Sequence, residues 1–235
     1  MLDSFDQYYD QAIELIKQRS INIDTTHRCL LQCPFCARQN YDHGKAFVKQ
    51  SQQMYGDIKL DHVRDLGNTW IHMSFCGQIS DPIFHSNFIG VIETLGETTC
   101  KKIDIHTTAS GKKIQWWNRL VDITNTTPQS MRWVFGIDGI DEKSALHRIN
   151  QNTSQALDAM KYVAGNTNDE VVWQYIPFGY NEDDIPAAID IANQHNIKLM
   201  ILKSGRFHEE GNILEPPKDK NLYNVYDFAK REYIN

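Results

Sequence analysis

Residues 21–36 read Ile-Asn-Ile-Asp-Thr-Thr-His-Arg-Cys-Leu-Leu-Gln-Cys-Pro-Phe-Cys, a short apolar run followed at once by cysteines. The run at 21–26 predicts a strand. The cysteines after it have the spacing C-x3-C-x2-C and are Cys29, Cys33 and Cys36. The chain has five cysteines, an odd number, and the other two lie far away, so a disulfide framework is not expected. Three thiols this close together indicate a metal site.

Outward from this segment, strand-like and helix-like apolar patterns alternate along the chain. The predicted strands cover residues 21–26, 69–75, 102–107, 132–137, 170–177 and 197–202. The predicted helices cover residues 4–18, 60–66, 84–95, 114–121, 154–163 and 182–195, with a last short helix at 222–233. Gly67 is expected to end the second of these helices. Strands separated by helices imply βαβ units and a parallel sheet with right-handed crossovers.

Six such units fit this length, whereas a closed eightfold barrel needs about 250 residues. We therefore expect an α/β fold, a partial (β/α)6 barrel preceded by the N-terminal helix. The core would cover residues 1–204, with the barrel at about 20–204, and a short C-terminal extension would cover 205–235. A flat doubly wound sheet is the alternative, because periodicity does not report curvature. Both architectures place function at the carboxyl ends of the strands.

Composition excludes several classes of protein. The 235 residues carry 24 Lys and Arg against 30 Asp and Glu, a net charge of −6, with 41% hydrophobic and 23% charged residues. These values exclude disordered, collagen-like and coiled-coil chains. No apolar run reaches the roughly 18 residues of a membrane span, and the N-terminus lacks the features of a signal peptide. We expect a soluble, cytoplasmic protein with no membrane partner, and the acidic balance disfavours a nucleic-acid partner.

The cysteine segment suits an iron–sulfur cluster. A [4Fe–4S] cluster normally takes four cysteines, so three of them leave one iron open to an added ligand. Two alternatives stay open. One is a zinc site with His27 or His43 as fourth ligand, although this spacing fits no common zinc pattern. The other is a set of structural thiols with no metal.

The segment resembles the radical S-adenosylmethionine (SAM) superfamily. The resemblance rests on the cysteine spacing, on Phe35 directly before the third cysteine, and on the position after the first strand. It covers roughly residues 20–204. It implies one [4Fe–4S] cluster held by the three cysteines, and SAM as the second cofactor with Phe35 at its site.

Three further segments extend the resemblance. After the third strand, His106-Thr-Thr-Ala-Ser-Gly111 occupies the place of a Thr-Asn-Gly turn of that family, with altered residues. The stretch Gly77-Gln-Ile-Ser80-Asp81-Pro82 resembles the glycine-rich turn of that family, which contacts the amino group of SAM, with Ser-Asp-Pro in place of Gly-Glu-Pro. At the fourth strand, Gly136-Ile-Asp138-Gly resembles a Ser-Ile-Asp-Gly segment of the peptide-maturase-like branch.

In that branch this segment is followed along the chain by an arginine that pairs with the SAM carboxylate. Arg148 lies at the matching spacing in this sequence. Paired guanidinium–carboxylate hydrogen bonds give it a physical reason for the role. A solvated surface arginine is the other interpretation. Gln174 on the fifth strand is a candidate contact to SAM or substrate. His72, His85 and His106 are each expected to be structural rather than catalytic, and Cys76 and Cys100 to be core residues, so that one cluster is expected.

Three functions remain open. The first is a radical enzyme that modifies a peptide or protein, favoured by the segment at the fourth strand. The second is a radical enzyme acting on a nucleotide or RNA, for which only the pairs Lys101-Lys102 and Lys112-Lys113 offer basic residues. The third is a non-catalytic iron–sulfur or zinc protein. Either enzyme would need an electron donor such as flavodoxin or ferredoxin.

Overall fold

The computed structural model describes residues 19–34, 36, 38, 56–77, 79–203, 213–219 and 222, together with the short strands at 226–227 and 232–233. The predicted helix at 4–18, Phe35 and His43 lie outside these residues, so the structure does not test them.

Six parallel strands form one sheet whose spatial order is the order of the chain. The strands are β1 (Ser20–Asn22), β2 (His72–Cys76), β3 (Lys102–Thr107), β4 (Ser130–Gly136), β5 (Glu170–Tyr175) and β6 (Lys198–Ile201). Each strand pairs only with its neighbours in sequence, and β1 and β6 are the two edges, so the sheet is open. A doubly wound sheet reverses its strand order at a switch point. The sequential order therefore confirms the predicted open (β/α)6 barrel over the alternative.

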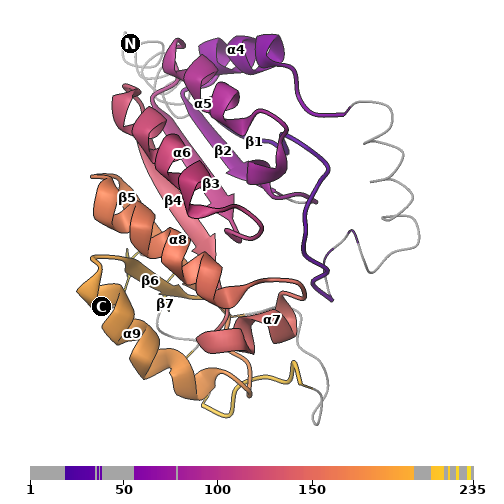
Figure 1. The fold of residues 1–235 in the computed structure, drawn as a ribbon, viewed down its shortest axis with the longest axis vertical. Helices are drawn as coiled ribbons and strands as arrows, with labels where there is room; N and C mark the ends of the chain where they lie inside the picture. The colour runs from indigo at the N-terminus through magenta and orange to yellow at the C-terminus, as the bar shows by residue number, and fades with distance from the viewer. Residues whose placement is uncertain are drawn as a thin grey trace, which may run out of the picture.

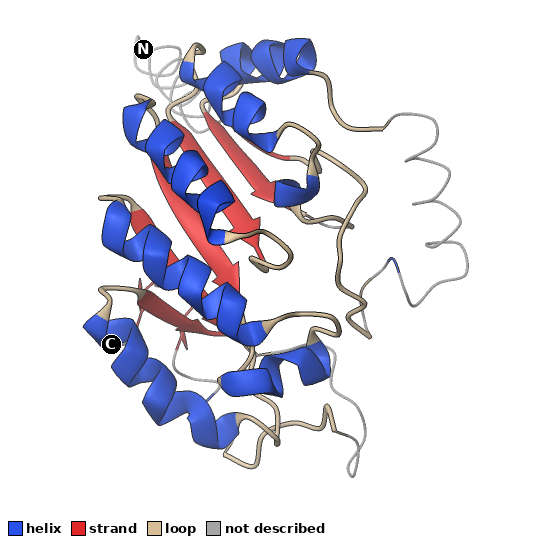
Figure 2. Ribbon diagram, viewed as in Figure 1, coloured by secondary structure: helices blue, strands red, loops and turns tan. Residues whose placement is uncertain are grey.

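Helices cover the outer face of the sheet (Figures 1 and 2). They are α4 (Leu60–Thr69), α5 (Phe88–Gly96), α6 (Ile114–Thr126), α8 (Thr153–Asn166) and α9 (Ile185–Gln194), each between two strands. Between β4 and α8 lie a 3-10 turn (Asp141–Lys143) and the short helix α7 (Ser144–His147). Alternate strand residues such as Met131, Trp133 and Phe135 are buried in the core beneath these helices. Their neighbours Arg132, Val134 and Gly136 therefore face the other, concave side.

The structure refines two predicted helices. The helix predicted at 84–95 is divided into a 3-10 turn (Pro82–Phe84) and α5, because Asp81 and Asn87 each cap a new start by accepting a hydrogen bond from a backbone N–H. Gly67 does not end α4, which continues to Thr69. A Cβ at Gly67 would lie 2.6 Å from the Thr98 hydroxyl oxygen, so close packing requires the glycine.

The structure corrects the prediction at two further places. The first strand ends at Asn22 rather than residue 26, because Asp24 and Thr26 use their side chains in tertiary hydrogen bonds, to the turn after β2 and to Asp57. The helix predicted at 222–233 is wrong. Two short antiparallel strands, β7 (Tyr226–Asp227) and β8 (Glu232–Tyr233), lie there instead. The aromatic and β-branched residues of this stretch favour strands. None of the helices in the described ranges is both long and apolar enough to cross a membrane.

Candidate active site

A cavity of about 160 Å³ lies at the carboxyl edge of the sheet. Six of the residues that the sequence assigned to the cluster or to SAM line it, namely Cys29, Gly77, Ser80, Asp81, Arg148 and Gln174. Its other lining residues are Cys76, His106, Thr107, Thr108, Val134 and Gly136. The lining comes from the loop after β1 and from the ends of β2 to β5, so the open barrel fold itself brings these distant residues together.

The turn after β2 is tight and tied to the loop after β1. A Cβ on Gly77 would lie 2.0 Å from the carbonyl oxygen of Ser80, so only glycine fits there. The Ser80 hydroxyl donates to the carboxylate of Asp24, which also accepts the backbone N–H of Ile79 at 3.4 Å. Asp24 therefore fixes the turn beside the cysteine segment.

Asp81 anchors this turn to the end of β3. Its carboxylate accepts hydrogen bonds from the hydroxyls of Thr107 (2.9 Å) and Thr108 (2.8 Å) and from the backbone N–H of Thr108 (2.9 Å). Burial raises the pKa of Asp81, and these hydrogen bonds oppose that rise. Both oxygens are engaged by the protein, so any contact from this turn to a ligand falls to its backbone. Pro82 starts the 3-10 turn, is buried and does not line the cavity.

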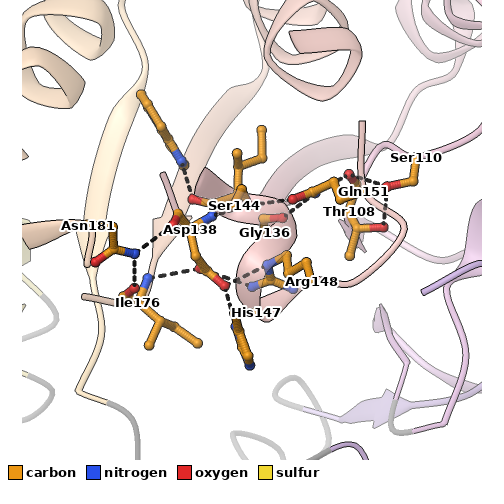
Figure 3. A network of polar contacts seen from close by, with 12 residues as sticks. Thr108, Ser110, Gly136, Asp138, Ser144, His147, Arg148, Gln151, Ile176 and Asn181 are labelled. Carbon is orange, nitrogen blue, oxygen red and sulfur yellow. Dashed lines mark hydrogen bonds and ion pairs between the residues drawn. The ribbon is translucent and has the colours of Figure 1, made fainter. Parts of the chain in front are cut away.

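A buried ion pair stands at the end of β4 (Figure 3). Arg148 contacts Asp138 through Nε at 2.8 Å and Nη2 at 3.2 Å, and His147 Nδ1 lies 2.7 Å from the same carboxylate. The backbone N–H of Ile176 donates to it at 3.0 Å. Burial alone would raise the pKa of Asp138, but the charge of Arg148 and the hydrogen bond from His147 hold it below its usual range.

Arg148 stands between this carboxylate and the cavity. It lines the cavity whereas Asp138 does not, so Asp138 positions the guanidinium from behind. The guanidinium lies on Gly136, where a Cβ would be 2.9 Å from Arg148 Cζ and 3.0 Å from Nη1. Glycine at position 136 thus makes room for the arginine. With 9% of its surface exposed, Arg148 is not the solvated surface arginine that the sequence left open.

A second set of hydrogen bonds joins the ends of β3 and β4. Gln151 donates from Nε2 to the carbonyls of Thr108 (2.8 Å) and Gly136 (3.0 Å), and its Oε1 accepts from the Ser144 hydroxyl (Figure 3). Ser144 Oγ in turn accepts the backbone N–H of Asp138 at 2.7 Å. Sequence reasoning missed this network. Its members are ordinary polar residues that only the fold brings together.

The three clustered cysteines are partly buried and carry free thiols. Burial, with Asp81 nearby, raises the pKa of Cys29 to about 12. Burial also raises the pKa of Cys33, against the nearby positive charge of Arg148. Cys36 lies one turn on, where its N–H donates to the Cys33 carbonyl at 3.1 Å. Among the described residues, no group of three or more His, Cys, Asp or Glu side chains is arranged to hold a metal ion.

Of the other candidates, Gln174 and His106 line the cavity, whereas His85, His72 and Cys100 do not. Gln174 lines the cavity beside Gly136, its register partner on β4. His106 also lines it, and burial lowers its pKa to about 4, so the ring is neutral at pH 7. His85 is structural, as expected, because its ring contacts the Ile58 carbonyl and the Asn87 N–H. His72 pairs with Asp104 at 3.1 Å. Cys100 is buried, as expected, whereas Cys76 is only partly buried and lines the cavity, so the expectation that it is a core residue is wrong.

The fold is that of an open parallel barrel, and it is similar to solved structures of SuiB from Streptococcus suis. SuiB bound to S-adenosylmethionine matches with a TM-score of 0.60 and 14% identity, over 90% of this chain and 48% of that chain. A second SuiB structure matches with a TM-score of 0.62 and 14% identity, over 89% of this chain and 46% of that chain. SuiB bound to precursor peptide SuiA matches with a TM-score of 0.56 and 14% identity, over 84% and 43%.

At this identity the likeness is one of fold, and it agrees with the resemblance to the radical SAM superfamily drawn from the sequence. The chain spans less than half the length of the SuiB chains it matches. No protein-family model and no curated protein sequence matches it.

Proposed function

We propose that this protein is a radical SAM enzyme that acts on a peptide. The observation that carries the proposal is the cavity of about 160 Å³ at the carboxyl edge, which brings Cys29 together with Gly77, Arg148 and Gln174. A [4Fe–4S] cluster bound beside it would supply the electron that cleaves SAM reductively to a 5′-deoxyadenosyl radical, which abstracts hydrogen from the substrate.

Cys29, Cys33 and Cys36 are the proposed ligands. Thiolates are the preferred ligands of iron–sulfur clusters, and three of them leave one iron open. Metal binding must displace the protons that burial now favours on Cys29 and Cys33. It must also bring the three thiols together, because the described residues hold no group of three such side chains arranged to bind a metal ion. Zinc remains an outcome of the test below.

The walls of the cavity suit the amino-acid part of SAM. Arg148 offers a guanidinium already fixed by Asp138, and a pre-oriented donor loses little freedom on binding a carboxylate. The turn from Gly77 to Pro82, with Ser80 and Asp81, offers backbone groups to the amino group. Gln174 also lines the cavity and is a further proposed polar contact. Phe35, next to the third cysteine, completes the set of proposed cofactor contacts.

A peptide is the proposed substrate because the sheet is open and SuiB, which shares the fold, was solved bound to a precursor peptide. An open mouth admits a substrate that itself excludes water from the radical. Residues 205–235 are the proposed extension beside this mouth. Their described part contacts the loop after β5, where the N–H of Gly179 donates to the Glu215 carbonyl at 3.1 Å. The proposed electron donor is flavodoxin or ferredoxin, and the proposed location is the cytoplasm.

Anaerobic reconstitution with iron and sulfide tests the proposal. We expect about four irons and four sulfides per chain. Reduction with dithionite in the presence of SAM should then yield 5′-deoxyadenosine. Cys33→Ala should lose both the cluster and this product, whereas the matched variant Cys100→Ala should keep both. Stoichiometric zinc without sulfide, or a full cluster in Cys33→Ala, would refute the proposed site.

A further inference from the structure

We propose that a surface beside the cysteine segment is the docking site of a small acidic electron-carrier protein. The surface, called here the rim surface, consists of Leu30, Lys112, Lys113, Ile114 and Ile149. The inference rests on the proposed function, because only a redox cluster at the cysteines needs such a partner.

The rim surface is continuous, because three loops meet there. The cysteine segment contacts the loop before α8, since the N–H of Gln32 donates to the Ile149 carbonyl at 3.0 Å and the Asn150 side chain donates to the Leu30 carbonyl at 3.3 Å. It also contacts the loop before α6, since a Cβ on Gly111 would lie 3.2 Å from Leu30 Cδ2.

Apolar side chains are exposed at the centre of this surface. Leu30 is 45% exposed, Ile114 40% and Ile149 39%. They account for half of the six large apolar side chains that are exposed among the described residues. Single exposed apolar residues are common, but a group of them beside a functional site indicates an interaction surface.

Positive charge flanks these apolar residues. Lys112 lies over the rings of Phe84 (5.4 Å) and Trp116 (4.9 Å), which hold its ammonium group in place. Lys113 is exposed and precedes α6, whose first turn has no side-chain cap.

A cavity of about 510 Å³ separates these lysines from the N-terminus of α8, so the positive ends of two helices face it. Asp158 is its one acidic lining residue. Trp117 also lines it, is fully buried, and has an indole N–H without a hydrogen-bond partner in the structure.

Of the acidic proteins that could bind this surface, an electron carrier fits its position best. Leu30 is the residue next to Cys29, so a protein docked there lies beside one of the proposed cluster ligands. Because electron transfer slows steeply with distance, an electron carrier must dock close to the cluster. An apolar centre with a charged rim, over a small area, is typical of transient redox complexes. The basic rim makes the expected partner acidic.

The test compares two electron sources for SAM cleavage by the reconstituted enzyme. Reduced flavodoxin is a protein donor that must dock, whereas dithionite is a small donor that need not. Lys113→Glu should lower the flavodoxin-driven rate of 5′-deoxyadenosine formation about fivefold at low salt, and by less than twofold at 0.5 M salt, because salt screens the rim. Its dithionite-driven rate should equal that of the wild type.

Lys101→Glu is the matched control. It makes the same charge change on an exposed lysine at the opposite, amino edge of the sheet, before β3, and should alter neither rate. Equal losses in Lys113→Glu and Lys101→Glu, or equal losses with both donors, would overturn the docking site.

Titration of oxidised flavodoxin into the reconstituted protein provides a readout that needs no SAM cleavage. Lys113→Glu and Ile149→Glu should each weaken binding several-fold, and Lys101→Glu should not. Unchanged binding in both rim variants overturns the inference. Failure of the wild type to cleave SAM with dithionite refutes the proposed function instead, whatever the binding result.

Discussion

Replacing Asp138 by Asn tests the structural role of the buried pair behind the cavity. The carboxylate meets Arg148 at 2.8 and 3.2 Å, His147 at 2.7 Å and the N–H of Ile176 at 3.0 Å, and both Asp138 and Arg148 are buried. Asparagine keeps the shape of the aspartate side chain but has one acceptor oxygen in place of two. Its amide hydrogens would face the donor groups that contact the carboxylate. The guanidinium of Arg148 is then buried without a counter-ion.

Removing one partner of a buried ion pair costs about 3–5 kcal/mol. For a chain of 150–250 residues, each kcal/mol lowers Tm by about 2–4 °C, so we expect a fall on the order of 6–20 °C. Thermal unfolding followed by circular dichroism measures it. Asp141→Asn, an exposed change three residues on, is the matched control and should shift Tm by less than about 2 °C.

A double variant sharpens this test. Asp138→Asn with Arg148→Met removes the unpaired charge, so we expect it to be more stable than Asp138→Asn alone. Because the pKa of Asp138 is held low, its contribution to stability is present above about pH 4 and is lost as the pH falls further. The difference between the wild type and Asp138→Asn should therefore shrink in acid. A fall in Tm below 2 °C for Asp138→Asn at pH 7 would refute the reasoning.

Two other substitutions test neighbouring parts of the cavity. Gly136→Ala places a Cβ 2.9 Å from Arg148 Cζ and should push the guanidinium out of place, which lowers SAM affinity about tenfold in equilibrium dialysis. An unchanged affinity would show that Arg148 does not contact SAM. His106 has its pKa lowered by burial to about 4 against an ordinary 6.5, so the unfolded chain binds its proton first and wild-type stability should fall from pH 6.5 to pH 4. In His106→Gln, urea unfolding should give a smaller fall over that range, and an identical fall would contradict the burial of this ring.

The order of strands and helices could be predicted from the sequence because each element buries one apolar face. The strand at 102–107 has the predicted bounds, because the alternation of apolar and polar residues marks where it begins and ends. The first strand and the segment at 222–233 could not be predicted. In the first strand, tertiary hydrogen bonds override the local pattern. In the segment at 222–233, strand pairing overrides it.

Much of the candidate site also followed from the sequence. Residues expected at the ends of parallel strands do meet at one cavity, because every strand ends at the same edge. The direction of a side chain could not be predicted from the sequence. The position of Asp138, behind Arg148 and not on the cavity wall, was therefore not predicted. The partners that fix these two, such as Ser144 and Gln151, carry no local signal at all.

The sequential strand order has a consequence for synthesis on the ribosome. Each of the strands β2 to β6 pairs with the strand made just before it, so the six-stranded sheet can grow at one edge while the chain emerges. The three thiols are complete by residue 36, whereas the last wall of the cavity, at Gln174, emerges much later. The nascent chain therefore carries Cys29 without its complete cavity until β5 has been made and has joined the sheet.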